Sequence, residues 1–290
     1  MSERHTPTLA IIADIHGNIP ALDATLADLE RIRPDRVVIA GDIVNRGPQS
    51  HLAVERVASL GLDVISGNHD TWLVRLARGE GRPGGWESSW WTPVRRAVEE
   101  LTPDDLAWLN ALPPRLSVTL PGAEPLLVVH GSPRHAREGM GRRIYDEQLA
   151  EALAGVEERT VVGAHIHYPW ERWLGDQHVV VIGASGCPFN GDINAQYGLF
   201  TWEDGAWRFE HRSVPYDHEP LYTIWSESGY LDDNSVAAEL MMLEHRTART
   251  QYVPFWEWAE ERGLPLTRAS LERFHAERTL APPPPWPLTA

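Results

Sequence analysis

The segment from Gly41 to Gly47 combines residue types that can bind a metal ion and a phosphate group. It follows the branched apolar run at 37–40, which predicts a buried strand. The carboxylate of Asp42 offers two oxygens that could bridge two cations, and the planar guanidinium of Arg46 matches the shape of a phosphate. Taken alone, the segment is equally consistent with a polar loop closed by an Asx turn.

Four further blocks of polar residues also follow short apolar runs. In chain order, they contain Asp14 and His16, then Asn68, His69 and Asp70, then His130, and finally His165 and His167. Ligands of open α/β sheets bind at the carboxyl ends of the strands, so these side chains can converge on one site. Each buried ionisable group needs a partner, and five such blocks therefore favour a functional site over chance.

The blocks contain the ligand types of a transition-metal site. Carboxylate and imidazole groups together suit Mn, Fe, Zn, Ni or Co better than Ca, and no thiolate is on offer. With His69 set aside, two aspartates, one asparagine and four histidines make seven ligands, too many for one tetrahedral ion. With Asp42 shared, they predict two divalent metal ions, manganese first and Fe, Zn, Ni or Co as alternatives. The remaining histidines match no block and are expected to be exposed, except for one treated below; they are His5, His51, His178, His211, His218, His245 and His275.

The order of strand-like and helix-like runs predicts an α/β fold of the α+β type. Between residues 9 and 70, apolar strands alternate with helices, a rhythm typical of parallel strands joined by right-handed crossovers. Between residues 170 and 212, four strand-like runs follow one another, with hairpin turn signals at 175–176 and 204–205. A parallel half is therefore expected to meet a more antiparallel half.

A helical insertion interrupts the strand pattern at 71–114. It contains a glycine-rich loop at 79–85 beside Trp86, Trp90 and Trp91. One interpretation is that the helices pack on the core. The alternative is a cap over the site, in which one indole ring stacks on a nucleobase and selects a nucleotide-like substrate.

The predicted domain boundaries separate a core at 1–215, which carries the insertion, from a helical C-terminal extension at 216–290 that packs on the core. The extension contains three helix-like runs and ends near four consecutive prolines, a sequence typical of a stiff tail.

Composition restricts the partners. The 290-residue chain carries a formal net charge of −15, which disfavours a surface that binds nucleic acid or anionic membranes. No apolar run approaches the roughly 20 residues of a membrane span, and the first residues lack the apolar core of a signal peptide. One cysteine, Cys187, excludes an internal disulfide and fits a reducing cytoplasm. We therefore expect a cytoplasmic protein that acts on a small phosphorylated substrate, with no stable nucleic-acid complex and no membrane partner.

The five blocks resemble the calcineurin-like metallophosphoesterase superfamily. Its pattern is an Asp-x-His, a Gly-Asp, a Gly-Asn-His-Asp/Glu, a later His and a Gly-His-x-His, and all five occur in order within residues 9–215. Residues 41–48 resemble the loop of the bacterial phosphoprotein phosphatase and diadenosine tetraphosphate hydrolase branch. Two positions depart from the pattern: Asn45 replaces an aspartate of the protein phosphatases, and Ala164 separates the last glycine from its histidine.

The resemblance implies a four-layer αββα sandwich of two mixed β-sheets flanked by helices, and it implies roles for individual residues. The two metals would be held by Asp14, His16, Asp42 and His167, and by Asp42, Asn68, His130 and His165. His69 would contact the phosphate or the leaving oxygen, oriented by Asp70, and Arg46 would bind a phosphoryl oxygen. On the residues alone, Asn45 and His135 are further candidates for substrate contact.

The implied activity is di-metal-dependent hydrolysis of phosphate esters by direct attack of a metal-bridging hydroxide on phosphorus. His69 would protonate the leaving alkoxide, and Arg46 would offset charge on the equatorial oxygens. Phosphomonoesterases, phosphodiesterases, symmetric dinucleoside polyphosphate hydrolases and protein Ser/Thr phosphatases share these ligands, so all stay open. A non-catalytic metal-binding regulatory protein is a remoter alternative, since no ligand is missing. A di-metal oxidase or storage protein is disfavoured, because those use Glu-rich helical bundles.

Overall fold

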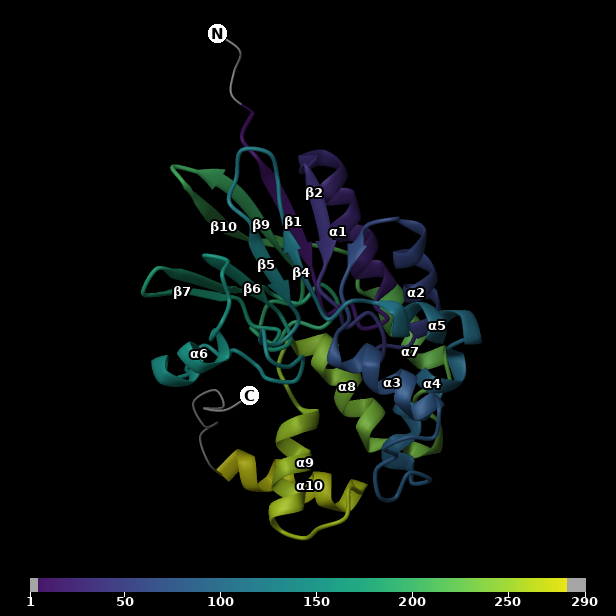
Figure 1. Cartoon of the computed structure of the whole chain (residues 1–290). Helices are drawn as coiled ribbons and strands as arrows, with labels where there is room; N and C mark the ends of the chain where they lie inside the picture. The colour runs from purple at the N-terminus through teal and green to yellow at the C-terminus, as the bar shows by residue number, and fades with distance from the viewer. Residues whose placement is uncertain (1–4, 281–290) are drawn as a thin grey trace.

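Two five-stranded β-sheets form the centre of the molecule (Figure 1). The computed structural model describes residues 5–280. The first sheet has the order β10-β9-β1-β2-β3 and consists of β1 (Thr8–Ile12), β2 (Arg36–Ile39), β3 (Asp63–Val64), β9 (Ala195–Glu203) and β10 (Ala206–Val214). The second has the order β4-β5-β6-β8-β7 and consists of β4 (Arg115–Val118), β5 (Leu126–Val129), β6 (Thr160–Gly163), β7 (Trp170–Leu174) and β8 (Gln177–Val181). Both sheets are mixed, since β1 and β8 each pair parallel with one neighbour and antiparallel with the other.

Helices surround the sheets. Their bounds are α1 (Ile19–Ile32), α2 (Ser50–Ser59), α3 (Asn68–Ala77), α4 (Thr92–Glu100), α5 (Pro103–Ala111), α6 (Asp146–Ala152), α7 (Glu219–Glu227), α8 (Val236–Thr247), α9 (Tyr252–Glu261) and α10 (Arg268–Leu280), with 3-10 turns η1 (Ser89–Trp91) and η2 (Asp232–Asn234). Asn18 caps α1 by accepting the backbone N–H of Ala21, and Pro20 lies in its first turn. Helix α7 is an addition to the predicted helices, and Pro220 in its first turn marks its start.

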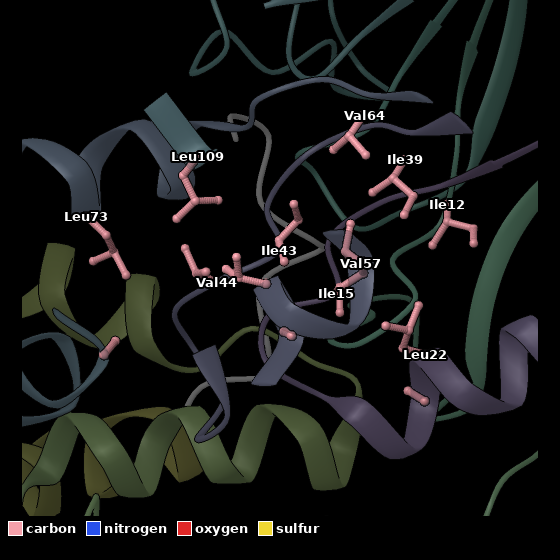
Figure 2. Close-up of a cluster of buried hydrophobic side chains, with 14 of the residues drawn as sticks. Ile12, Ile15, Leu22, Ile39, Ile43, Val44, Val57, Val64, Leu73 and Leu109 are labelled. Carbon is pink, nitrogen blue, oxygen red and sulfur yellow. The ribbon is translucent and has the colours of Figure 1, made fainter. Parts of the chain in front are cut away.

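Alternation along the strands gives each sheet two apolar faces. On β1, Leu9 and Ile11 pack between the sheets against residues of the second sheet such as Val128. The intervening Ile12 belongs to a cluster on the other face, together with Leu22 of α1 (Figure 2). The first sheet is therefore buried on both sides.

The second sheet repeats this arrangement. Val128 of β5 faces the first sheet, whereas its neighbours Leu127 and Val129 pack with Leu149 of α6 and with Leu153. The order of layers is helix, sheet, sheet, helix, which confirms the four-layer αββα sandwich.

The insertion and the C-terminal extension pack on each other. Helix α4 and turn η1 contact α8, and Trp90 of η1 is buried and stacks on Tyr252, with ring centroids 4.6 Å apart. None of the helices in residues 5–280 is both long and apolar enough to cross a membrane. The predicted proline-rich tail, at 282–285, lies outside the described residues.

Candidate metal centre

The loops that follow the strands of both sheets bring together the seven predicted metal ligands, Asp14, His16, Asp42, Asn68, His130, His165 and His167. Within each of two groups, the ligand atoms lie within 4.8 Å of one another: Asp14 with His16 and His167, and Asp42 with His130 and His165. Asn68 adjoins the second group, because its Oδ1 lies 3.0 Å from His130 Nε2. Asp42 also adjoins the first group, because its Oδ2 is 3.8 Å from His16 Nε2.

Backbone carbonyls fix the orientation of three imidazole rings. The Nδ1 of His16 lies 3.1 Å from the carbonyl oxygen of Val44, and that of His130 lies 2.8 Å from the carbonyl oxygen of Ala40. The Nδ1 of His167 is hydrogen-bonded to the carbonyl oxygen of Cys187. Since a carbonyl oxygen can only accept, each Nδ1 carries a hydrogen and donates it, which leaves Nε2 as the nitrogen that could bind a metal ion.

The buried carboxylates of Asp14 and Asp42 are suited to binding a cation. Asp14 Oδ1 and Asp42 Oδ2 are buried and accept no hydrogen bond from the residues that the structure describes. Burial raises the pKa of Asp14 to about 8. Burial opposes protonation of His130, but the Asp42 carboxylate raises the pKa of that imidazole to about 10. Near pH 7, protons on Asp14 and on His130 thus offset the negative charge of the two carboxylates, a role that two divalent ions would take over.

The site residues share an unusual backbone conformation. Eleven non-glycine residues of the described chain have positive φ, and seven of them are candidate site residues: Asp14, His16, Asp42, Asn45, Arg46, His165 and His167. Such conformations cost free energy and persist where the surrounding structure determines them. Their concentration at the strand ends supports a functional site rather than ordinary loops.

Glycines allow the loops to approach closely. A Cβ on Gly67 would lie 2.1 Å from Asp42 Oδ1, an oxygen that accepts the backbone N–H of His69 at 2.8 Å. A Cβ on Gly41 would lie 2.4 Å from the backbone nitrogen of Gly67. The Gly-Asp and Gly-Asn-His-Asp blocks are therefore packed backbone against backbone.

Asp70 does not orient His69, which corrects the role expected for it. Its buried carboxylate instead accepts the backbone N–H groups of Asp42 at 2.8 Å and Gly67 at 2.8 Å, and so holds the two blocks together. The partner of the His69 ring is Asn45, whose Nδ2 lies 2.8 Å from His69 Nδ1. The ligand atom of His69 also lies within 4.8 Å of those of Asp42 and a neighbouring histidine.

Arg46 is buried and has a partner that the sequence motifs do not reveal. Its Nη2 donates to Glu244 Oε2 in a buried ion pair between α8 and the loop after β2. Burial lowers the pKa of the guanidinium, but the Glu244 carboxylate outweighs this effect and raises the pKa above its usual value.

The residue after Glu244, His245, is also buried, with Nδ1 3.0 Å from the carbonyl oxygen of Gly186. The expectation of exposed histidines is therefore wrong for His245 and for His178, which are buried, whereas His51, His211 and His218 are half-buried.

A cavity of about 960 Å³ opens over the site. Its lining includes Asp42, Arg46, His69, His165 and His167, and beyond them Arg134, Arg142, Arg143, Tyr145, Tyr168, Phe189 and Arg249. His135 is exposed and does not line it, because its ring turns back to accept the backbone N–H of Arg137 at 3.0 Å. Trp86, Trp90 and Trp91 do not line it either. Trp90 packs on the extension and the other two pack on the core, which favours the packing interpretation of the insertion over the cap.

Comparison with known proteins identifies the family. Residues 7–246 match the family model of the calcineurin-like phosphoesterases. An uncharacterised protein of Methanocaldococcus jannaschii is 27% identical over 74% of this chain and 90% of its own length. The symmetrical bis(5'-nucleosyl)-tetraphosphatase of Paracidovorax citrulli is 36% identical over 42% of this chain, a match that spans 43% of that relative.

Solved structures agree with the fold. A metallophosphoesterase from Sphaerobacter thermophilus superposes with a TM-score of 0.66 at 23% identity, over 84% of this chain and 100% of its own. A hypothetical protein from Pyrococcus horikoshii OT3 superposes with a TM-score of 0.68 at 20% identity, over 81% and 97%. These two likenesses concern the fold, whereas the family model covers most of the chain and the strand-end blocks. The chain therefore belongs to the calcineurin-like phosphoesterase family and is a phosphoester hydrolase.

Proposed function

We propose that the chain is a di-metal-dependent phosphoesterase that hydrolyses small phosphate esters by direct attack on phosphorus, without a phosphoenzyme. The observation that carries this proposal is the pair of ligand groups that meet at Asp42. Arg46 and His69 line the cavity that opens over them. A phosphate bound there would therefore lie beside the metal ligands and would contact both the guanidinium of Arg46 and the proton donor His69.

The ligands of the first metal would be Asp14, His16, Asp42 and His167, and those of the second Asp42, Asn68, His130 and His165. Two divalent ions, when bound, supply Lewis acidity that polarises phosphoryl oxygens and activates water. Mixed carboxylate and imidazole ligands favour manganese, with Fe, Zn, Ni and Co as alternatives. A cytoplasmic location fits the single buried Cys187, which is free.

His69 would hold the proton for the leaving group. Asn45 Oδ1 accepts the backbone N–H of Arg46 at 2.8 Å, which leaves its Nδ2 to donate to His69 Nδ1. Burial lowers the pKa of His69 to about 4, so the ring is neutral near pH 7. Its own proton therefore belongs on Nε2, where it can donate to the leaving oxygen.

Arg46 would bind an equatorial phosphoryl oxygen. The ion pair with Glu244 uses Nη2, while Nε is buried and has no hydrogen-bond partner among the described residues. The guanidinium lies 5.3 Å from the centre of the Phe189 ring, which limits its movement. A fixed cation beside the metals offsets charge that develops on the phosphoryl group.

Substitution of the shared ligand tests the proposal. Wild-type protein prepared without chelator should contain two metal ions per chain and hydrolyse p-nitrophenyl phosphate with Mn²⁺. Asp42→Asn should lose most of the metal and nearly all activity, whereas Asp176→Asn, on an exposed turn, should lose neither. Elemental analysis showing at most one ion in the wild type would refute the two-metal site.

Symmetric hydrolysis of dinucleoside polyphosphates is a second candidate activity. It is supported by the 36% identity to the tetraphosphatase of Paracidovorax citrulli. A panel of mononucleotides, cyclic nucleotides, dinucleoside polyphosphates and phosphopeptides, each assayed with Mn²⁺, separates this activity from monoesterase, diesterase and protein phosphatase activity. A preference for diadenosine tetraphosphate over every other member would establish it.

A further inference from the structure

We infer that the cavity beyond the metal ligands binds the second phosphate and the base of a nucleotide substrate, through Arg142, Arg249 and Tyr145. This inference rests on the proposed phosphoesterase function and specifies the class of its substrate. The class is nucleotides with at least two linked phosphates.

The size of the cavity is the first reason. At about 960 Å³ it lies near the upper end of the roughly 300–1,000 Å³ typical of small-molecule sites. The scissile phosphate would occupy only the part beside Asp42, His69 and Arg46. The remaining volume extends along residues 138–151 and along the start of α9, and it has room for a larger group attached to that phosphate.

One wall of this outer part is anchored to β7. The Trp170 indole donates to the carbonyl oxygen of Met140 at 2.9 Å, and Arg172 donates to that of Ile144 at 3.0 Å. Met140 itself is buried. The backbone between these two points is thus held at both ends, and it presents Arg142 to the cavity. Hydrogen bonds to β7 therefore hold this wall of the cavity in place.

The wall carries an exposed aromatic ring. Tyr145 is 72% exposed, the highest value among the exposed large hydrophobic residues of the described chain. It lines the cavity and directly precedes α6, whose first turn includes Asp146. A single exposed ring at the mouth of the cavity suits stacking on a planar base.

The second wall comes from the C-terminal extension. Arg249 follows Ala248, which ends α8 in the left-handed conformation at φ 47. The carbonyl oxygen of Ala248 accepts the backbone N–H of Gly191 at 2.9 Å, which ties this turn to the loop before β9. Arg249 is exposed and lines the cavity.

Charge supports an anionic ligand at these two arginines. Arg46 and Arg134 are already paired, with Glu244 and Glu138. By contrast, no carboxylate of residues 5–280 forms an ion pair with Arg142 or with Arg249; Arg142 instead lies over the Tyr168 ring and donates to its hydroxyl at 3.4 Å. Two guanidinium groups that line one cavity and form no ion pair within the described chain are suited to a phosphate beyond the one being cleaved, although Glu257 also lines that cavity.

The inference is tested by inhibition of p-nitrophenyl phosphate hydrolysis, with tripolyphosphate, AMP and diadenosine tetraphosphate as probes. In the wild type, diadenosine tetraphosphate should bind at least tenfold more tightly than AMP. Arg142→Ala and Arg249→Ala should each weaken both tripolyphosphate and diadenosine tetraphosphate by about fivefold or more. Tyr145→Ala should weaken diadenosine tetraphosphate by about fivefold or more and leave tripolyphosphate unchanged, because tripolyphosphate has no base.

Matched variants make the result specific. Tyr145→Phe should behave as the wild type, since it keeps the ring, and Arg208→Ala, an exposed arginine of β10 outside the cavity, should change no inhibition constant. All variants should keep the wild-type turnover of p-nitrophenyl phosphate and the wild-type melting temperature. If the wild type hydrolyses p-nitrophenyl phosphate but diadenosine tetraphosphate binds no better than AMP, the inference fails while the proposed function stands. If the wild type hydrolyses no ester, the proposed function itself fails.

Discussion

At the scale of single residues, the contact between Asn45 and His69 departs from what the motif leads one to expect. An aspartate at position 45 would accept a hydrogen bond from His69 Nδ1–H and stabilise the imidazolium. The asparagine amide instead faces His69 Nδ1 through its Nδ2, with its oxygen occupied by a backbone N–H. In the proposed mechanism the ring would therefore act through Nε2, and its share in catalysis would depend on how much the leaving group needs a proton.

His69→Ala should therefore lower kcat on alkyl phosphates by roughly 10²–10⁴ while both metals stay bound. The loss should be much smaller on p-nitrophenyl phosphate, whose leaving group scarcely needs protonation. Steady-state kinetics on the two substrates, with metal analysis of the variant, check this. Equal losses on both would exclude the role of proton donor.

Gly67→Ala should disrupt the centre by steric conflict. The new Cβ would stand 2.1 Å from Asp42 Oδ1, so the Asp42 side chain must move. Overpacking of this kind costs about 1–3 kcal/mol in stability, and the variant should also lose metal and activity. Gly84→Ala, where a Cβ would meet nothing within 4 Å, is the control. Elemental analysis showing full metal content in Gly67→Ala would contradict the prediction.

At the scale of elements, the strands and their loops could be predicted from the sequence, but their long-range partners could not. Apolar runs followed by Gly-Asp or His-x-His give local signals for β2 and for the loop after β6, and the structure brings those residues together. Glu244 lies in the ordinary amphipathic helix α8, 198 residues from Arg46, and no spacing rule links them. Tyr145 likewise acquires its place in the cavity only through the anchoring of its loop on β7.

Helix α8 should hold Arg46 in place through Glu244. In Glu244→Gln, Oε1 can still accept the backbone N–H groups of Gln251 and Tyr252, which are 2.7 and 2.9 Å away in the wild type, so the start of α9 is kept. The charge that holds the guanidinium is lost. We expect KM for p-nitrophenyl phosphate and Ki for inorganic phosphate to rise about tenfold, equivalent to about 1.4 kcal/mol, with metal content unchanged.

Two further variants separate positioning from general destabilisation. Glu244→Asp keeps the charge and should recover part of the phosphate affinity. Glu239 lies on the same helix and forms a half-exposed ion pair with Arg268. Glu239→Gln breaks that pair and should change neither KM nor Ki. A Glu244→Gln enzyme with wild-type KM and Ki would show that the ion pair serves stability alone.

At the scale of the whole molecule, a buried carboxylate contributes to the dependence of stability on pH. Asp28 of α1 accepts hydrogen bonds from Tyr197 at 2.7 Å and Arg212 at 3.2 Å, and so ties the helix to β9 and β10. Burial raises the pKa of Asp28, but these hydrogen bonds outweigh it and leave the pKa below its ordinary value. A lowered folded-state pKa stabilises the protein above about pH 4, and that contribution is lost as the pH falls through the folded-state value.

Asp28→Asn should therefore lower the free energy of unfolding at pH 7 by about 1–3 kcal/mol. The difference from the wild type should shrink as the pH drops below about 4. Denaturant titrations at pH 7 and pH 3 measure both effects. Asp23→Asn, on the exposed side of the same helix, should have little effect at either pH, and a constant difference between Asp28→Asn and the wild type would contradict the assignment.

The ion pair between Arg46 and Glu244 has a consequence for the order in which the protein is made. During synthesis the amino-terminal part of a chain is available to fold first. All seven candidate metal ligands have been added once His167 is in the chain, and the first sheet has its strands once β10 is complete. The buried guanidinium receives its counter-charge only when Glu244 is added. A nascent chain can thus contain all seven candidate ligands before the Arg46 guanidinium has its counter-charge, and we expect full phosphate affinity only after α8 has been synthesised.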